Sequence, residues 1–570
     1  AIWARELLDG KPCALHKLLT VWLQSGMVRA IERPLQRAVN VAFRGRDSYQ
    51  VVRTTVLTIA MVRVWQQLWR IKAREGLVAY LVAVVAPWLK RLPQVRRKLE
   101  KETEKTTSDL RAKFAKDVVS PQMRLPVDGM SEKDIIGVLV PRKELDTQHW
   151  VQGKITGAVY SGQLDHHDFV GKILAMWAFC NPLHPSIHPS LRQMDSEVVQ
   201  MIVNMYHGDG DCCGAFTTGG TESILMAMKA YRDWGKAEKG ITEPNIVVCK
   251  TAHAAFDKAG KYFNIFVRHA RTNAQMEVDL RHMRSLIDRN TVAVVGSACQ
   301  FAHGTVDPIE SIAEIARTKN IGLHVDCCLG GFLVPFMAQA GFEMAPVDFR
   351  VKGVTSISCD PHKYGFAPKG SSVVMFANRG LRHHMYCYLT DWTGGIYATP
   401  TMTGSRAGGP VAATWAAMCK FGESGYVETT RQIVGATRRI AEGVRQIDGL
   451  RLVGRPDVCV VAFAGTESSK INCYSVSDCM HQKFGWDLQS CQDPPCVHLA
   501  LTLPTSMNAE QFLKDLRESV EMVNADTSGL FASTAGLYGM AASLPATFLE
   551  DAAGAYLDAM NEAIVPSDGR

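Results

Sequence analysis

The 570-residue sequence lacks several features that define common protein classes. It contains no internal repeat and no low-complexity tract, which argues against a repeat array. Its 16 cysteines show no CxxC…CxxC spacing, and the adjacent pairs Cys212-Cys213 and Cys327-Cys328 favour free thiols on the cytosolic side. His184 and His188 are four residues apart, but the prolines around them exclude the helix that would align them, so we expect no metal site.

Long apolar runs are also scarce, which limits how the chain can meet a membrane. Val51–Trp69 is apolar, but Arg53 and Arg63 interrupt it, and a central arginine costs about 2.5–3.5 kcal/mol on insertion scales. Leu77–Leu89 is shorter and contains a proline. A poor span and a pair of interfacial helices are equally compatible with these residues. No cleavable signal peptide is recognisable, and a start at Ala1 without methionine is compatible with a missing upstream piece.

The net charge of +7 is modest, and much of the basicity lies in one early stretch. Trp65, Trp69 and Trp88 are interleaved with it, a pattern that suits an anionic membrane surface better than nucleic acid. Its basic residues are Arg70, Lys72, Arg74, Lys90, Arg91, Arg96, Arg97, Lys98 and Lys101. With 47% apolar residues, the chain can hold two or three domains.

One lysine stands out in residues 355–371, TSISCDPHKYGFAPKGS. Val354–Ser358 alternates like the end of a buried strand, and Asp360-Pro361 breaks it, so that His362 and Lys363 stand at the mouth of a turn. A lysine there, beside a neutralisable histidine, can lose its proton and hold pyridoxal phosphate as a Schiff base. Taken alone, the same pattern also fits a solvated surface lysine.

A glycine-rich turn upstream is suited to binding a phosphate group. Residues 215–223, AFTTGGTES, precede the apolar-periodic run 224–231, so we expect a helix to begin here with Thr221 as its cap. The free N–H groups at a helix start bind phosphate without a basic side chain. An ordinary glycine-capped helix is the alternative.

Two further strand ends supply the other contacts that this cofactor needs. Asp326 ends a short apolar strand and can pair with the pyridine nitrogen. His253 follows the strand 246–249 among small residues and has room to lie flat on an aromatic ring. Each of these two residues can also have a purely structural role. The glycine turn, His253, Asp326 and Lys363 follow one another along the sequence, each at a strand end. This order predicts an α/β sheet with its ligand at the carboxyl ends of the strands.

Several long stretches then follow, in order, the pattern of one enzyme family. They include GAVYSG (157–162), NPLHP (181–185), TTGGTESILMAMKAYRD (217–233), HVDCCLGGFLVPFM (324–337), HKYGFAPKGSSV (362–373) and DWTGGIYATPTMTGSRAGG (391–409). Through them the chain resembles the sphingosine-1-phosphate lyase family, whose members depend on pyridoxal phosphate and are related to group II amino-acid decarboxylases. The resemblance implies an aspartate-aminotransferase-type α/β fold (fold type I), with a large parallel or mixed-sheet domain, a smaller C-terminal α/β domain and an N-terminal membrane-associating helix.

The resemblance implies roles for single residues. Lys363 would form the Schiff base, Asp326 would pair with the pyridine nitrogen, His253 would stack on the ring, and Tyr397 would lie near the reacting carbons. The residues that would contact the cofactor phosphate are Gly220, Thr221 and His362, with Ser405 in a loop (404–406) that approaches from a second subunit. The residues that would line the phosphate end of the substrate pocket are Tyr160, His184 and Lys369.

Two positions depart from the pattern of the family. Pro361 stands where threonine is usual, which removes a hydroxyl and stiffens the lysine loop. Cys327 replaces the usual alanine after Asp326 and places a polarizable atom near the ring. Neither change removes a catalytic group.

The implied reaction is a retro-aldol cleavage of sphingosine 1-phosphate, or a related phosphorylated sphingoid base, to a long-chain aldehyde and phosphoethanolamine. The resemblance also implies a homodimer with active sites at the interface, and an anchor in the endoplasmic reticulum membrane with the catalytic part facing the cytosol. A group II amino-acid decarboxylase and a non-catalytic membrane scaffold derived from the enzyme are the alternatives.

The expected organisation has five parts. They are a leader (1–48), a membrane-associating region (49–92), a charged helical linker and N-terminal segment (93–165), a large cofactor domain (166–400) and a small C-terminal α/β domain (401–570). Within these we expect an exposed polar helix over 99–116, helices over 309–318 and 509–524, and a strand over 458–464.

Overall fold

The computed structural model describes residues 92–115, 122–469, 471–526, 530–531 and 546–562. The chain divides into two compact units, Ala1–Glu102 and Thr103–Arg570. The expected leader and all but the last residue of the expected membrane-associating region lie outside the described residues. No helix among the described residues has the length and apolar character needed to cross a membrane.

A seven-stranded sheet forms the centre of the second unit, in the order β1-β7-β6-β5-β4-β2-β3. The strands are β1 (Cys213–Thr217), β2 (Asn245–Cys249), β3 (Phe266–Ala270), β4 (Thr291–Ser297), β5 (Gly322–Cys327), β6 (Ser356–Cys359) and β7 (Ser372–Phe376). β7 runs antiparallel to both of its neighbours, and the other strands are parallel. The parallel strands therefore end at one edge of the sheet, where the turns after β1, β2, β5 and β6 meet.

Both faces of this sheet are covered, since β2, β4, β5, β6 and β7 are buried along their whole length. The helices that pack against it are α9 (Pro189–Met205), α10 (Gly220–Lys239), α11 (Ala255–Phe263), α12 (Leu280–Leu286), α13 (Ile309–Lys319) and α14 (Arg379–His383). The helix α8 (Leu164–Met176) and the 3-10 helix η1 (Val334–Phe336) belong to the same part of the chain. α13 confirms the helix expected over 309–318. Earlier in the chain, α6 (Pro93–Ala115) confirms a helix over the polar stretch, and α7 (Glu132–Trp150) follows it.

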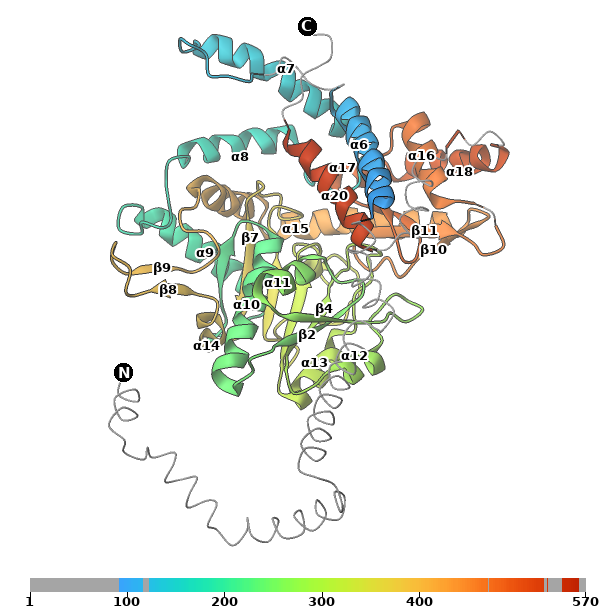
Figure 1. Cartoon of the computed structure of the whole chain (residues 1–570). Coiled ribbons are helices and arrows are strands. Elements are labelled where there is room, and N and C mark those ends of the chain that lie inside the picture. Colours follow the sequence, from blue (N-terminus) through green and yellow to red (C-terminus); the bar gives the residue numbers. More distant parts are fainter. Residues whose placement is uncertain (1–91, 116–121, 470, 527–529, 532–545, 563–570) are drawn as a thin grey trace, which may run out of the picture. The chain divides into compact units, whose positions relative to one another are not determined.

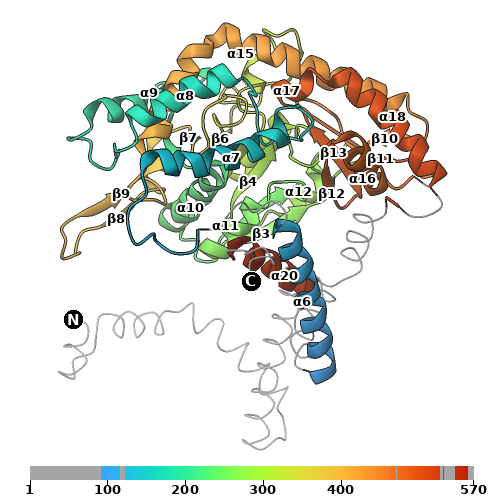
Figure 2. The same cartoon turned by 90° about the horizontal axis from the view of Figure 1, so that it is seen from above.

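A second, antiparallel sheet follows the long helix α15 (Gly408–Arg445), which is kinked at Gly422. Its order is β10-β11-β13-β12. The elements of this part are β10 (Leu450–Leu452), β11 (Val460–Gly465), α16 (Cys473–Phe484), β12 (Gln489–Cys491), β13 (Cys496–Ala500), α17 (Leu503–Ser506), α18 (Ala509–Ala525) and α20 (Ala546–Asn561). β11 and α18 confirm the strand and helix expected here. The hairpin β8 (Cys387–Leu389) and β9 (Tyr397–Thr399) lies at the opposite end of this unit (Figures 1 and 2).

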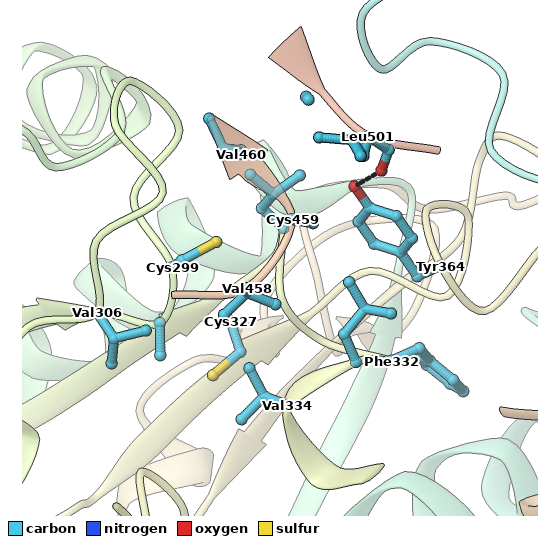
Figure 3. Close-up of a cluster of buried hydrophobic side chains, with 14 of the residues drawn as sticks. Cys299, Val306, Cys327, Phe332, Val334, Tyr364, Val458, Cys459, Val460 and Leu501 are labelled. Carbon is cyan, nitrogen blue, oxygen red and sulfur yellow. Dashed lines mark hydrogen bonds between the residues drawn. The ribbon is translucent and has the colours of Figure 1, made fainter. Parts of the chain in front are cut away.

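The hydrophobic core joins the two sheets directly behind the lysine turn (Figure 3). Tyr364, which follows Lys363, is 1% exposed and donates a hydrogen bond from its hydroxyl to the carbonyl of Leu501 at 2.7 Å. Cys299 and Cys459 lie beside it in the same cluster. The position of the lysine turn therefore depends on the smaller sheet as well as on the larger one.

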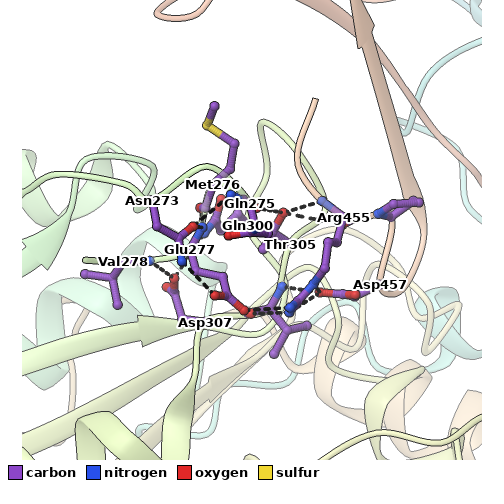
Figure 4. A network of polar contacts seen from close by, with 12 residues as sticks. Asn273, Gln275, Met276, Glu277, Val278, Gln300, Thr305, Asp307, Arg455 and Asp457 are labelled. Atoms are coloured by element: carbon purple, nitrogen blue, oxygen red, sulfur yellow. Dashed lines mark hydrogen bonds and ion pairs between the residues drawn. The ribbon is translucent and has the colours of Figure 1, made fainter. Parts of the chain in front are cut away.

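A polar network connects the two sheets at a second place (Figure 4). Arg455 forms ion pairs with Glu277 at 2.8 Å and with Asp457 at 3.1 Å. Asp457 also accepts a hydrogen bond from the backbone N–H of Val306 at 2.8 Å. Beside them, Asp307 is buried, and this burial raises the pKa of its carboxyl to about 6. Residues after β10 are thus fixed to the loops after β3 and β4.

Candidate active site

Lys363 lies in the turn after β6, next to a buried carboxylate. Its Nζ is 3.2 Å from Oδ2 of Asp360, whose side chain is 2% exposed. Burial acts to lower the pKa of Lys363, but attraction by Asp360, with help from Cys328 and Tyr160, raises it well above the ordinary value. In this state Lys363 is therefore an ammonium ion, whereas the sequence led us to expect an easily deprotonated amine. The motif did not reveal that the side chain of Asp360 turns back toward Lys363.

His362 is fixed by the following loop and lies near the same carboxylate as Lys363. Its Nδ1 forms a hydrogen bond with the carbonyl of Ser371, and its Nε2 lies 3.7 Å from Oδ2 of Asp360. Burial lowers the pKa of His362, so the ring is neutral near pH 7. A neutral ring whose Nδ1 donates to a carbonyl leaves Nε2 as an acceptor.

The glycine turn after β1 opens the helix α10, as expected, but its cap differs from the prediction. Gly219 is the N-cap residue, so no side chain accepts a hydrogen bond from the first turn of the helix. Thr221 lies inside the helix. The expectation that Thr221 caps the helix was wrong because the helix begins at Gly220, two residues earlier than a cap at Thr221 would place it. Free backbone N–H groups at this end remain available for an anion.

Gly220 is required by space. A Cβ atom at this position would lie 2.6 Å from Oδ2 of Asp360 and 2.7 Å from Sγ of Cys328. Nearby, Glu222 accepts hydrogen bonds from the backbone and hydroxyl of Thr218, both at 2.6 Å, and from the backbone N–H of Met402 at 3.0 Å. These hydrogen bonds to Glu222 therefore fix the conformation of the glycine turn.

Asp326 is the last but one residue of β5 and is buried. Its Oδ1 accepts a hydrogen bond from the backbone N–H of Cys328 at 2.9 Å and from the hydroxyl of Ser358 at 3.2 Å. Ser358 contacts Nε2 of His324 at 3.2 Å, and Nδ1 of His324 contacts the hydroxyl of Ser356 at 2.8 Å. Burial lowers the pKa of His324 to about 4, so the ring is neutral.

This hydrogen-bonded chain continues along the sheet. Ser356 contacts the hydroxyl of Tyr231 at 2.6 Å, and Tyr231 contacts the hydroxyl of Thr355 at 2.7 Å. Tyr231 and Thr355 line a separate cavity of about 510 Å³. Sequence reasoning missed His324, Ser358, Ser356 and Tyr231 as supports of Asp326. The only available signal was the alternation of polar side chains in two strands that proved to be neighbours.

Two of the cavities that Lys363 lines contain most of the expected residues. The larger one, about 620 Å³, is lined by Gly220, Thr221, His362 and Lys369. The smaller one, about 180 Å³, contains Asp326 and Tyr160. His253 and Lys363 line both cavities. The residues expected to contact the ring and the cofactor phosphate therefore surround one continuous region, apart from Ser405.

Of the three residues expected at the substrate phosphate, the structure brings two together. Nζ of Lys369 lies 5.0 Å from the ring centre of Tyr160, and both line a cavity of about 260 Å³. Burial lowers the pKa of Lys369, and burial, partly opposed by Lys363, raises that of Tyr160 to about 12. His166 and His167 line the same cavity and were missed, because a histidine pair on an amphipathic helix carries no distinctive spacing.

Three expected residues line none of the cavities described above. His184 is exposed in the turn between α8 and α9. Tyr397 lies in the hairpin, 36% exposed, with its ring centre 6.1 Å from that of Trp392. Ser405 precedes Arg406, whose guanidinium is bound by Asp195 at 2.6 Å in the same chain.

Pyridoxal phosphate fits the residues that surround Lys363. The uncapped end of α10 and the space left by Gly220 suit a phosphate group. The buried carboxylate of Asp326 suits a protonated pyridine nitrogen, and Lys363 can bond the aldehyde carbon. Oδ1 of Asp360 is buried and has no hydrogen-bond partner among the described residues, which is consistent with a polar group missing beside it.

Comparisons with known proteins agree with this geometry. Residues 127–465 match the model of the pyridoxal-dependent decarboxylase conserved domain. The chain is similar to sphingosine-1-phosphate lyase of Drosophila melanogaster, at 41% identity over 90% of this chain and 94% of that protein. It is also similar to sphingosine-1-phosphate lyase 1 of Rattus norvegicus, at 40% identity over 90% of each.

Solved structures give the same result. A sphingosine-1-phosphate lyase of Burkholderia pseudomallei has a TM-score of 0.68 and 37% identity, covering 73% of this chain and 97% of that chain. Glutamate decarboxylase of Lactobacillus brevis has a TM-score of 0.62 at 20% identity, covering 72% and 97%, a likeness of fold alone. The expected α/β fold of the pyridoxal-phosphate-dependent type is thereby confirmed.

Proposed function

This chain belongs to the sphingosine-1-phosphate lyase family, and we propose that it cleaves sphingosine 1-phosphate, or a related phosphorylated sphingoid base, to a long-chain aldehyde and phosphoethanolamine. The enzyme is a carbon–carbon lyase that depends on pyridoxal 5'-phosphate. The observation that carries the proposal is the convergence of Lys363, Asp326, His253 and the start of α10 on one region.

Each of these groups has a distinct task. When bound, pyridoxal phosphate accepts the electron pair released as the C2–C3 bond of the substrate breaks. Asp326 would pair with the pyridine nitrogen and favour its protonated form, and the position of Asp326 is held by hydrogen bonds from Cys328 and Ser358. Lys363 would hold the cofactor aldehyde, and as a free amine it lies beside Asp360, so its Nζ is an ammonium that can return a proton.

Lys369 and Tyr160 would hold the phosphate of the substrate. Lys369 contributes positive charge, while burial keeps the Tyr160 hydroxyl protonated and able to donate a hydrogen bond. A phosphate fixed at this end limits rotation about the bonds near C2, so that the breaking bond can stand perpendicular to the cofactor ring. This arrangement favours substrates that carry a phosphate group over those that carry none.

We further propose that the enzyme is a homodimer whose active sites lie at the interface. Helix α7 buries none of its residues and exposes Ile136 and Leu139, and the hairpin exposes Trp392 and Ile396. Large exposed apolar side chains in groups indicate a surface that another chain covers. A second copy is the partner that also explains why His184, Tyr397 and Ser405 lie away from the cavities of their own chain.

We also propose that the N-terminal region anchors the enzyme in the endoplasmic reticulum membrane, with the catalytic part in the cytosol. The support is the sequence alone, namely the apolar stretches within 49–92 and the basic residues that follow Trp69. Free thiols throughout the described part of the chain suit a reducing compartment.

The proposed reaction is tested by incubating the full chain, loaded with pyridoxal phosphate, with sphingosine 1-phosphate and measuring long-chain aldehyde and phosphoethanolamine. Lys363→Ala should abolish both products. Release of CO₂ from an amino acid without aldehyde formation would instead indicate a group II decarboxylase. A protein without the visible absorbance of bound cofactor would indicate a scaffold. Borohydride reduction and peptide mapping should place the cofactor on Lys363.

A further inference from the structure

The hairpin of the smaller sheet carries two cysteines directly opposite each other. Cys491 ends β12, Cys496 begins β13, and the two are paired in the antiparallel register. Cys491 is 8% exposed and Cys496 is fully buried. Directly opposite residues have Cβ atoms about 4.5–5.5 Å apart, and a disulfide needs about 3.5–4.5 Å, so a small approach of the strands suffices.

A histidine lies against this pair. Nδ1 of His498 is 3.5 Å from Sγ of Cys491 and 3.1 Å from the carbonyl of Ala302. A carbonyl only accepts, so Nδ1 carries the hydrogen and also directs it toward the sulfur of Cys491. His498 is 1% exposed, and its Nε2 is buried without a partner among the described residues.

The two sulfurs differ in how readily each loses a proton. Contact with Cys496, together with His498, lowers the pKa of Cys491 to about 5 against the effect of burial, whereas contact with Cys491 and burial raise the pKa of Cys496 strongly. A thiolate beside a thiol is the arrangement in which one sulfur attacks an oxidant and the other then resolves the product.

Other cysteine pairs in the described chain lack this arrangement. Cys299 and Cys459 contact each other in the core, but the pKa of Cys299 is raised by that contact and by burial. Cys327 and Cys359 are register partners in neighbouring strands, and burial raises the pKa of both. Protonated buried thiols react slowly with oxidants.

The hairpin also borders the active site. His498 and Gln489 line the cavity of about 180 Å³ that contains Lys363 and Asp326. The ring of Phe301, another lining residue, packs edge-on against His498 with centres 4.9 Å apart. A change in the contact between His498 and Cys491 would therefore alter the wall of this cavity.

We propose that Cys491 and Cys496 form a reversible disulfide site that responds to hydroperoxides and acts on the active-site wall through His498. The thiolate of Cys491 attacks the peroxide and becomes a sulfenic acid, releasing hydroxide or alkoxide, which takes up a proton. The thiol of Cys496 then displaces water from that sulfur and closes the S–S bond. In total, two thiols and one hydroperoxide give one disulfide, one alcohol (or water) and one water, and a dithiol reductant reverses the change.

The first test maps the bond in the full-length protein loaded with pyridoxal phosphate. The protein is treated with hydrogen peroxide, alkylated, and cut before aspartate, which separates the two cysteines at Asp493. We expect residues 487–492 linked to a peptide that begins at Asp493, with the link lost after dithiothreitol. Free alkylated thiols at both positions, or links from either to other cysteines, would overturn the proposal. This test does not depend on the proposed lyase reaction.

Variants test the order of attack and the link to activity. In Cys496→Ser, peroxide should leave a sulfenic acid on Cys491 that dimedone traps, whereas Cys491→Ser should leave Cys496 unmodified. Oxidised parent protein should lose roughly half or more of its aldehyde production and recover with dithiothreitol. Cys387→Ser/Cys419→Ser, which removes two exposed thiols, should respond like the parent. A fully active linked protein would refute the effect on the active site.

Discussion

Asp360 should control how readily Lys363 captures its cofactor. In this structure Nζ of Lys363 lies 3.2 Å from Oδ2 of Asp360, and the two side chains are 21% and 2% exposed. At an effective dielectric constant of about 20, this distance corresponds to an attraction of about 5 kcal/mol between unit charges, which the burial of both groups partly offsets. A neighbouring carboxylate typically shifts a pKa by about 1–3 units, so Asp360→Asn should lower the pKa of Lys363 by about that amount.

The expected result is an increase in the rate at which Lys363 captures pyridoxal. The neutral amine is the nucleophile, and near pH 7.5 its fraction rises about tenfold for each unit by which the pKa falls. Asp360→Asn, freed of cofactor, should therefore capture pyridoxal at least about tenfold faster than the parent, measured as the growth of visible absorbance. Pyridoxal is preferred to pyridoxal phosphate, because it carries no phosphate that the carboxylate of Asp360 would repel.

A second buried carboxylate provides the control. Asp326 also acts on Lys363, but more weakly than Asp360. Asp326→Asn should therefore change the pH dependence of pyridoxal capture less than Asp360→Asn does. An unchanged or slower rate in Asp360→Asn would refute the view that this carboxylate holds Lys363 as an ammonium ion.

Three further predictions follow from the same geometry. Gly220→Ala places a Cβ 2.6 Å from Asp360 and should weaken pyridoxal phosphate binding by roughly tenfold or more, measured by absorbance titration. Lys369→Ala should raise KM for sphingosine 1-phosphate while the absorbance of the bound cofactor stays intact. Burial lowers the pKa of His303 to about 4 from 6.5, so the native protein loses stability as pH falls through this window. His303→Leu should gain up to about 1.4 kcal/mol relative to the parent per pH unit below 6.5, measured by urea unfolding at pH 7.5 and 5.

Each of these predictions has a matched control. Gly171→Ala adds a Cβ with no atom within 4 Å and should leave cofactor affinity unchanged. If Lys369→Ala loses the cofactor absorbance, Lys369 serves the cofactor and not the substrate. His481→Leu removes an exposed histidine and should show no pH-dependent gain. An equal gain at pH 7.5 and 5 for His303→Leu would contradict the titration argument.

Local patterns were sufficient to predict that Lys363, Asp326 and His253 lie close together. Lys363, Asp326 and His253 each follow or end an apolar strand, and parallel strands bring such ends to one edge without further information. The residues that hold these side chains in place by hydrogen bonds from distant positions in the sequence were not predictable in this way. His324 bonds Ser356, which is 32 residues away, and nothing in either strand alone indicates that the strands are neighbours.

Other failures have different causes. The cap of α10 was misplaced by two residues, at Thr221 instead of Gly219, because both Gly219 and Gly220 can adopt the backbone that a helix start needs. The protonated state of Lys363 depends on the direction of the Asp360 side chain, which a motif does not specify. For His184 and Tyr397, no single chain could show the expected contacts if a second copy completes the site.

The hydrogen bond from Tyr364 to the carbonyl of Leu501 connects the turn that carries Lys363 to the end of the smaller sheet. Because the acceptor is backbone, a side-chain substitution at Leu501 leaves this bond in place, whereas Tyr364→Phe removes it. Loosening of the smaller sheet by denaturant should then disturb Lys363 before the larger sheet unfolds. The visible absorbance of the enzyme would in that case serve as an early indicator of damage far from the cofactor.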